Sequence, residues 1–354
     1  MVYKKPTLAF VDHSFHKKTH SADFLRDFFR DYFDITDYWD ERWCGGAAVS
    51  SYLLNQHEYV FYFQVINDFS ELKKVKSKII WAPMYDGLPP GNFFWKVVGA
   101  LGIKLICFSA PVFSKAYENN IPNIRVKYYR ESILSEKLLF GGLKKKISIF
   151  FWYRGGIRFS DWKKLFNPSD IERVVYLSIP DPNHVKENIS KEDIVKYKID
   201  VISTSFLPHE EYLRFISECD IFIAPRKKEG IGMSFLEALA MGKGLVGYND
   251  GTMNEYIKHG VNGYIFDERT FYTINISDIQ SILKKSTEDA IEGYRLWEGQ
   301  KKEMLAFIFS NSRQVASREV VNMYILLNCI NRFYYLFISF FKKIRRILIK
   351  DDLL

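Results

Sequence analysis

Two glutamates bracket a glycine-containing loop in the second half of the chain. Glu229 precedes Gly230 and Gly232, and Glu237 follows about two turns later, inside a helix that we expect to run to about Met241. Glycines let the backbone approach a ligand closely, and a helix N-terminus carries free N–H groups and a partial positive charge that suit phosphate. Carboxylates only accept hydrogen bonds, so they suit sugar hydroxyls. The alternative is an ordinary helix start with an outward-facing second glutamate.

A second group of polar side chains follows the first apolar run of the chain. Three histidines, His13, His16 and His20, stand among lysines, and Ser21 is expected to cap a helix over Ser21–Phe33. Such a loop can bind an anion, with His20 and Ser21 as its candidate cleft residues, or its side chains can simply be solvated. We expect no metal here, because no carboxylate or thiol at ligand spacing completes the three histidines.

Short apolar runs alternate with helix-like stretches, a pattern typical of α/β units around parallel sheets. A basic, glycine-containing stretch, Gly141–Lys146, separates two such series and reads as a linker. The expected strands are Thr7–Val11, Tyr59–Gln64, Ile79–Trp81, Lys104–Phe108 and Arg125–Tyr128, and then Ile147–Tyr153, Arg173–Ser178, Asp200–Thr204, Ile221–Ala224 and Gly244–Gly247. The pattern predicts two consecutive α/β modules.

The composition narrows the class of protein. The chain has 354 residues, of which 47% are hydrophobic and 26% charged, and this balance excludes a disordered chain, a fibre and a multi-pass membrane protein. A net charge of +8 favours a phosphate-rich partner. The basic residues are scattered or gathered in the tail without a nucleic-acid motif, so we expect no nucleic acid. The four cysteines form no C-x-x-C pair, which favours buried thiols in a reducing cytosol.

The tail differs from the rest of the chain. Residues 332–350 read RFYYLFISFFKKIRRILIK, an aromatic and aliphatic run that passes into a basic cluster. The apolar part is about half of what a bilayer span requires. An interfacial helix meeting anionic lipid fits this composition, and a last helix packed on the body is the alternative. The first apolar run predicts a core strand rather than a signal peptide, so we expect a cytoplasmic protein at the inner face of the cell membrane.

The segment Asp220–Asp267 resembles the donor-site signature of retaining glycosyltransferases with the GT-B fold, in particular family 4, the glycosyl transferases group 1. The E-x7-E motif is Glu229 and Glu237, inside a wider match from about Phe206 to Phe266. The stretch TMNEYIKHGVNGYIF is similar to a later family element, with Glu255 before an NG turn. The likeness is strong over about residues 147–267, weaker before them and absent in the tail.

The resemblance implies two Rossmann-like domains facing each other across a cleft. Residues 1–140 would be the acceptor domain, 141–310 the nucleotide-sugar donor domain, and 311–354 the C-terminal helices, the crossover and the basic amphipathic tail. It also implies that Glu229 holds hydroxyls of the donor sugar and that Glu237 binds the ribose. The backbone amides facing the donor sugar and diphosphate would be those of Gly230, Ile231, Gly232, Met233 and Ser234.

Further roles follow from the same resemblance. Arg154 and Arg158 would bind the diphosphate, and Lys163 is a further candidate for the same role. The G-R…K-G sequence that is usual in the family is altered at this point. The loop containing Phe206 would line the nucleobase. Asp86 stands near the place of a family histidine and would orient the acceptor hydroxyl, unless Asp86-Gly87 is only a turn. The usual glycine-rich loop after the first strand is missing.

The expected function is retaining transfer of a sugar, of hexosyltransferase type, from a UDP- or GDP-linked donor to a glycan or lipid-linked glycan in cell-surface polysaccharide biosynthesis. The family resemblance implies a reaction without metal or other cofactor. A GT-B-fold nucleotide-sugar epimerase and a non-catalytic membrane-bound scaffold are the alternatives. Epimerases lack the bracketed pair of glutamates, and donor hydrolysis would exclude the scaffold.

Overall fold

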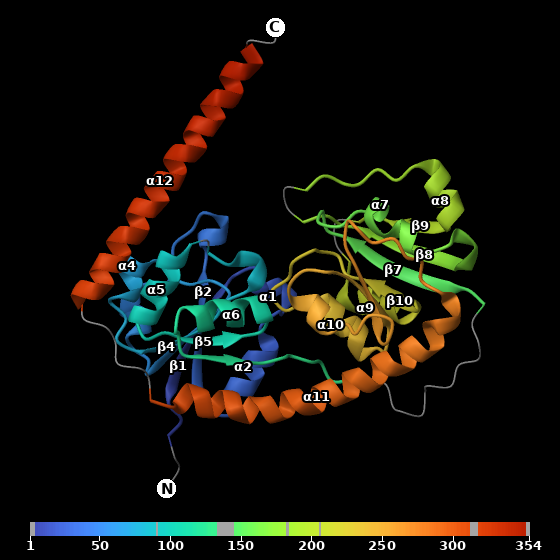
Figure 1. Cartoon of the computed structure of the whole chain (residues 1–354). Helices are drawn as coiled ribbons and strands as arrows, with labels where there is room; N and C mark the ends of the chain where they lie inside the picture. Colours follow the sequence, from blue (N-terminus) through green and yellow to red (C-terminus); the bar gives the residue numbers. More distant parts are fainter. Residues whose placement is uncertain are drawn as a thin grey trace.

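Two six-stranded parallel sheets form the body of the molecule (Figure 1). The computed structural model describes residues 4–89, 91–132, 145–181, 184–204, 207–311 and 318–351. The strand order is β2-β1-β3-β4-β5-β6 in the first sheet and β12-β11-β10-β7-β8-β9 in the second. Every strand pair in both sheets is parallel. The predicted pair of consecutive α/β modules is therefore confirmed, and the junction expected at residues 140 and 141 lies outside the described residues.

The first sheet covers residues 7–125 and the second covers residues 147–266. The strands of the first sheet are β1 (Thr7–His13), β2 (Asp34–Asp40), β3 (Tyr59–Phe63), β4 (Lys78–Ala82), β5 (Lys104–Cys107) and β6 (Asn123–Arg125). Those of the second are β7 (Ile147–Tyr153), β8 (Ile171–Ser178), β9 (Ile199–Ile202), β10 (Ile221–Ile223), β11 (Gly244–Tyr248) and β12 (Gly263–Phe266). Central strands such as β3 are buried along their whole length, as parallel strands covered on both faces must be.

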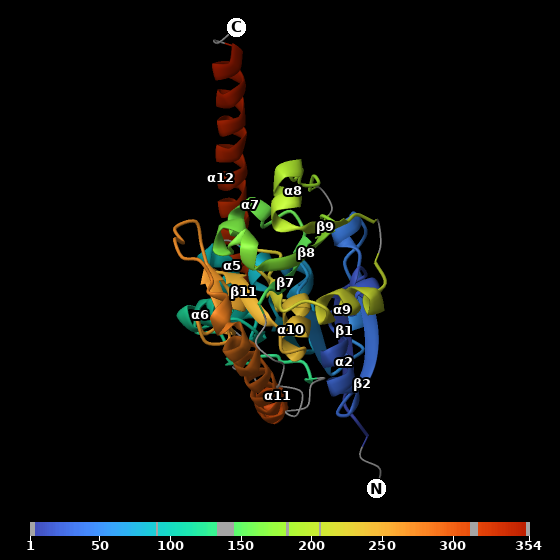
Figure 2. The same cartoon turned by 90° about the vertical axis from the view of Figure 1, so that its right-hand side faces the viewer.

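Helices connect the strands and cover the sheets (Figures 1 and 2). In the first domain they are α1 (His16–Thr19), α2 (Asp23–Arg30), α3 (Ser51–Leu54), α4 (Phe69–Leu72), α5 (Asn92–Ala100) and α6 (Ala110–Glu118). In the second they are α7 (Phe159–Trp162), α8 (Lys191–Tyr197), α9 (His209–Ser217) and α10 (Met233–Ala240), and the chain ends with α11 (Ile279–Phe309) and α12 (Arg318–Asp351).

Some sequence expectations are wrong in detail. The helix expected over Ser21–Phe33 is α2, which begins at Asp23 with Ala22 at its N-cap, because the Ser21 hydroxyl lies 2.9 Å from the Thr19 hydroxyl instead of capping the helix. The strand expected over Arg125–Tyr128 is β6, which ends at Arg125. The edge strands β2 and β12 were not expected. The sequence of β2, DITDYWD, is acidic, and only its last residue is fully buried, so it lacks the apolar run of a buried strand.

The long helix α11 joins the two domains along the lower side of the view in Figure 1. Its first turns bury Ile279 and Ile282 in the second core, and its last residue, Phe309, stacks on Phe33 of the first domain with ring centroids 5.2 Å apart. The buried ammonium of Lys104, on β5, donates to the carbonyl oxygens of Phe307, Ile308 and Ser310 at 2.7, 3.1 and 2.6 Å. A buried cation therefore caps the C-terminal end of the connecting helix, where the helix dipole is negative.

The first half of the last helix, α12, packs on the body. Val321 is buried, and Tyr324 and Ile325 pack against the first core. Asn331 lies beside Gly91, and the C-terminal part of the helix extends away from both domains (Figures 1 and 2). Its exposed large apolar side chains are Met323, Leu326, Ile330, Phe333, Tyr334, Leu336, Phe337 and Phe340. Within the described ranges, no helix combines the length and the apolar character that crossing a membrane requires.

Candidate active site

The two bracketing glutamates occupy the positions that their spacing predicts. Glu229 lies on the loop between β10 and α10, and Glu237 lies within α10. Gly232 is the N-cap residue of this helix, with a φ of +80°, a left-handed conformation that favours glycine. The carboxylates are buried, with residue exposures of 8% for Glu229 and 9% for Glu237. The loop and the start of α10 therefore form a turn with a buried carboxylate on each side.

A loop of the first domain lies directly against this turn. A Cβ atom at Gly230 would come within 2.7 Å of the Met84 sulfur, so only glycine permits this approach of the two domains. Next to Met84, the Tyr85 hydroxyl donates to Asp250 Oδ1 at 2.8 Å. Met84 and Tyr85 follow the carboxyl end of β4, and the glycine loop follows the carboxyl end of β10. The carboxyl-terminal edges of the two sheets thus face each other here, which is where open parallel sheets bind ligands.

Two arginines and three carboxylates gather at this junction. Asp181 binds both arginines: Arg154 donates to its Oδ1 at 2.8 and 2.9 Å, and Arg226 donates to its Oδ2 at 2.5 and 3.1 Å. Arg154 Nη1 lies 3.8 Å from Glu229 Oε1, and Arg226 Nη1 lies 3.6 Å from Glu229 Oε2. Arg226 Nη1 is also 3.7 Å from Asp86 Oδ2, across the domain boundary. The arginines are therefore held in place by carboxylates while facing the glycine loop.

The pKa values of two carboxyl groups at this junction, Glu229 and Asp86, are raised. Burial raises the pKa of Glu229, and the charges of Arg226 and Arg154 oppose the shift only in part. Burial also raises the pKa of Asp86, again against the opposing charge of Arg226. Perturbed carboxyl groups beside fixed cations are typical of functional sites. The arrangement can bind anionic oxygens through the arginines and hydroxyl groups through the carboxylates.

Glu237 has partners of its own. Arg130 Nη1 donates to Glu237 Oε1 at 2.8 Å, and His209 Nε2 lies 3.7 Å from the same oxygen. Burial raises the pKa of Glu237, with Arg130 and His209 acting in the opposite direction. Arg130 belongs to the segment that follows β6, so this ion pair also crosses from the first domain to the second.

Residues 182–289 match the family model described as glycosyl transferases group 1. No curated protein sequence matches the chain. Among solved structures, the lipopolysaccharide outer core galactosyltransferase WaaB, in its apo form, aligns with a TM-score of 0.55 and 12% identity over 86% of this chain and 99% of that one. A glycosyltransferase from Rickettsia africae aligns with a TM-score of 0.54 and 13% identity over 88% and 100%. Anabaena HepE in complex with UDP and glucose aligns with a TM-score of 0.50 and 10% identity, over 85% of this chain and 100% of that one.

The fold is GT-B. This confirms the fold class expected from the sequence. Glu229, Glu237 and Arg226 lie inside the segment that matches the family model, whereas Arg154 and Asp86 lie outside it. The contact geometry rather than the family match therefore joins these two residues to the glycine loop.

The other predicted site residues are placed as follows in the GT-B structure. Arg158 is exposed at the start of α7, where its backbone N–H donates to Asp161. Lys163 is paired with Asp193 at 2.8 Å. Phe206 lies outside the described residues. His20 bonds to Asp23, so the contacts of His20 and Ser21 lie within the first domain.

One part of the expectation for the first loop is wrong. A carboxylate does stand with the histidines: Asp12 Oδ1 lies 2.6 Å from His16 Nδ1, and ligand atoms of Asp12, His13 and His16 lie within 4.8 Å of one another. Asp12 lies near the end of β1 and His16 begins α1, so the short connection between the strand and the helix brings the two side chains together. The other Asp12 oxygen accepts from Arg26 at 2.8 Å, so both oxygens of this buried carboxylate hold the loop together.

Two residues of the junction were not identified from the sequence. Arg226 lies in the loop directly after β10, three residues before Glu229, and its position among PRKK was the available signal. Asp181 follows the carboxyl end of β8 closely, and a search for polar residues after each expected strand would have found it.

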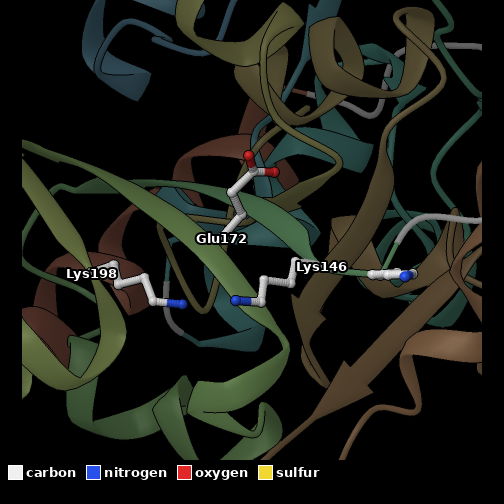
Figure 3. Close-up of a pocket in the computed structure, with 4 residues that line it drawn as sticks. Lys146, Glu172 and Lys198 are labelled. Atoms are coloured by element: carbon white, nitrogen blue, oxygen red, sulfur yellow. The ribbon is translucent and has the colours of Figure 1, made fainter.

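A basic hollow lies elsewhere on the second domain (Figure 3). It is lined by Lys145, Lys146, Glu172 and Lys198, and the ammonium groups of Lys146 and Lys198 point toward each other. These residues stand at the amino ends of β7, β8 and β9. The hollow is therefore at the opposite edge of the sheet from Glu229.

Proposed function

We propose that the protein is a retaining glycosyltransferase that moves a sugar from a nucleotide-sugar to a glycan or lipid-linked glycan in cell-surface polysaccharide biosynthesis. The observation that carries this proposal is the E-x7-E pair, Glu229 and Glu237, on either side of the N-terminus of α10. Two arginines lie beside Glu229, and Arg130 lies beside Glu237. Most of this arrangement lies in the segment that matches the glycosyl transferases group 1.

In the proposed reaction, Glu229 accepts hydrogen bonds from hydroxyls of the donor sugar, and Glu237 accepts them from the ribose. The amides at the start of α10, with Arg154 and Arg226, bind the diphosphate. The bond between the anomeric carbon and the phosphate oxygen breaks, and a bond to the acceptor oxygen forms on the same face. The leaving phosphate takes the proton of the acceptor hydroxyl, which Asp86 orients. The fixed arginines stabilise the negative charge that develops on the diphosphate, so the proposed reaction requires no metal.

A hexose linked to UDP is the donor to test first, with GDP-sugars second. HepE is described in complex with UDP and glucose, and WaaB is described as a galactosyltransferase. Both are similar to this chain in fold, and we propose that this chain uses a donor of the same class.

The binding part of the proposal is tested by thermal shift without added metal. We expect UDP or GDP, alone or as sugar conjugates, to raise the melting temperature, because a ligand at 100 times its dissociation constant adds about 2.7 kcal/mol of stability. Glu237→Ala is expected to remove the shift. Unchanged melting temperatures with every nucleotide, or an equal shift in Glu237→Ala, would contradict the proposed donor site.

Arg226 provides a second test, matched with Arg158. We expect Arg226→Ala to lower kcat/KM for transfer or donor hydrolysis by about 10- to 100-fold, because a hydrogen bond to a charged group contributes about 1.5–3 kcal/mol. Arg158→Ala removes an exposed arginine from the same domain and is expected to have a smaller effect. Steady-state kinetics of the two variants measure which of the two arginines contributes more to transfer. A larger loss in Arg158→Ala would assign the diphosphate to that side chain instead.

We also propose that the enzyme works at the cytoplasmic face of the cell membrane, with α12 bound to the anionic surface. The exposed apolar residues of this helix include Met323, Leu326, Ile330, Phe333 and Leu336. They recur at intervals of three or four residues, and the sequence beyond them carries the basic cluster KKIRR. An apolar face combined with basic residues favours binding in the plane of an anionic interface.

Deletion of residues 332–354 is expected to release the protein from phosphatidylcholine vesicles that contain phosphatidylglycerol. A basic residue near an anionic surface contributes about 1 kcal/mol, so replacing Lys342, Lys343, Arg345 and Arg346 with glutamine should weaken binding by up to about 10³-fold. Sedimentation with vesicles at low and high salt measures both variants. Unchanged sedimentation of both variants, or a wild type that does not sediment with the vesicles, would show that α12 has another role.

A further inference from the structure

Two large aromatic side chains are exposed beside the loop that follows β1 in the first domain. Trp43 exposes 52% of its surface and Phe15 exposes 38%. Their ring centroids are 5.5 Å apart in an edge-on arrangement, and the His13 ring stacks on Phe15 with centroids 6.3 Å apart. Exposed rings that pack on one another form a preformed apolar surface with little conformational freedom to lose on binding.

A chain of hydrogen bonds holds the edge of this surface. The Trp43 indole N–H donates to the Ser14 hydroxyl at 3.0 Å, and that hydroxyl donates to Glu41 Oε2. The hydrogen bond from Ser14 lowers the pKa of Glu41, with further lowering from Cys44 and Lys17, so this carboxylate is ionised at neutral pH. Among the described residues, none donates to Glu41 Oε1. The indole is thus fixed next to an acceptor that can bind a ligand hydroxyl.

The position of these residues relates them to the proposed active site. Ser14 and Phe15 follow β1, and Trp43 follows β2, so all three lie beyond the carboxyl ends of their strands. The loop that contacts Gly230 follows β4 at the same edge. The order β2-β1-β3-β4 separates β2 from β4 by three strand spacings of about 4.8 Å, roughly 14 Å in all. In Figure 1, α1, which directly follows Phe15, lies on the side of the first domain nearest the second.

We propose that Trp43 and Phe15, with Glu41, bind a sugar ring of the acceptor glycan, a few units from the hydroxyl that reacts. The C–H groups on one face of a pyranose carry partial positive charge and pack on the negative face of an indole. A hydroxyl of the same ring donates to Glu41 Oε1. The ionised carboxylate disfavours uronic acids, so the ring is a neutral hexose or N-acetylhexosamine. This inference rests on the proposed glycosyltransferase function.

The test uses the full chain and an array of immobilised mono- to tetrasaccharides, some neutral and some containing uronic acids. We expect binding to neutral oligosaccharides that falls at least about tenfold in Trp43→Ala, since a lost aromatic contact and its buried area together exceed about 1.4 kcal/mol. Trp43→Phe should restore part of the binding, and Glu41→Gln should reduce the preference for neutral glycans. Tyr52→Ala removes another exposed aromatic residue of this domain and serves as the matched control.

Melting temperatures with and without UDP are measured for every variant. Equal glycan binding by wild type and Trp43→Ala, or no glycan binding by wild type, would overturn the inference. If glycan binding depends on Trp43 but no nucleotide shifts the melting temperature, the sugar-binding surface stands and the proposed transferase function fails. If nucleotides bind and glycan binding is insensitive to Trp43, the donor site stands and the acceptor surface lies elsewhere.

Discussion

Replacing Glu229 with alanine is expected to lower kcat/KM for sugar transfer by about 10²- to 10⁴-fold while leaving the protein folded. The proposed role of Glu229 is to accept two hydroxyl hydrogen bonds from the donor sugar. Each hydrogen bond to a charged group contributes about 1.5–3 kcal/mol, and 1.4 kcal/mol corresponds to a factor of ten. The fold should persist because Asp181 still binds both Arg154 and Arg226 in the variant.

The control for this variant is Glu218→Ala. Glu218 lies just after α9 of the same domain and pairs with Arg173 at 2.6 Å on the surface, so its loss removes a carboxylate without touching the glycine loop. Transfer or donor hydrolysis is measured for both variants, together with their circular dichroism. Turnover like that of wild type in a folded Glu229→Ala protein would remove Glu229 from the proposed mechanism.

The isosteric variant Glu229→Gln adds a stability test with a defined sign. Because the pKa of Glu229 is raised in the folded state, its contribution to stability is present below the unfolded pKa, about 4.3, and is lost as the pH rises through the folded pKa. Glutamine has no charge to bury, so Glu229→Gln should melt at a higher temperature than wild type at pH 7. The difference should shrink as the pH falls toward the unfolded pKa. If wild type is more stable than Glu229→Gln at pH 7, the attraction of the Glu229 carboxylate to the two arginines outweighs the cost of burying its charge.

Replacing Lys104 with methionine is expected to destabilise the folded protein by about 2–4 kcal/mol. The ammonium donates to three carbonyl groups at the end of α11 and to the Ser310 hydroxyl. Each charged hydrogen bond contributes about 1.5–3 kcal/mol, a cation at a helix C-terminus about 0.3–1 kcal/mol, and burial of the charge offsets part of the sum. Urea unfolding followed by tryptophan fluorescence measures the loss.

The matched variant is Lys96→Met, which removes an exposed lysine from α5 of the same domain. It is expected to change the stability by no more than about 0.5 kcal/mol. If both variants unfold at the same urea concentration as wild type, the hydrogen bonds of Lys104 do not hold α11 to the first domain.

The glycine loop and the two modules were determined by the sequence alone. A buried strand, two glycines and a helix that carries Glu237 are consecutive, so their local geometry depends on neighbours in the chain. The alternating apolar runs likewise predicted the parallel sheets, because parallel strands are buried on both faces. Strands such as β2 were missed since an acidic edge strand has no such run.

Only the tertiary structure decided which other residues join the glutamates. Asp86 and Arg226 are far apart in the chain and meet because the carboxyl ends of β4 and β10 face each other across the two domains. Arg130 reaches Glu237 because the segment after β6 crosses to the second domain. The sequence predicted only that Lys104 lies on a strand. Its hydrogen bonds to the end of α11 depend on where that helix ends in the folded structure. Local patterns follow from backbone geometry and burial, whereas these pairings follow from the packing of one domain on the other.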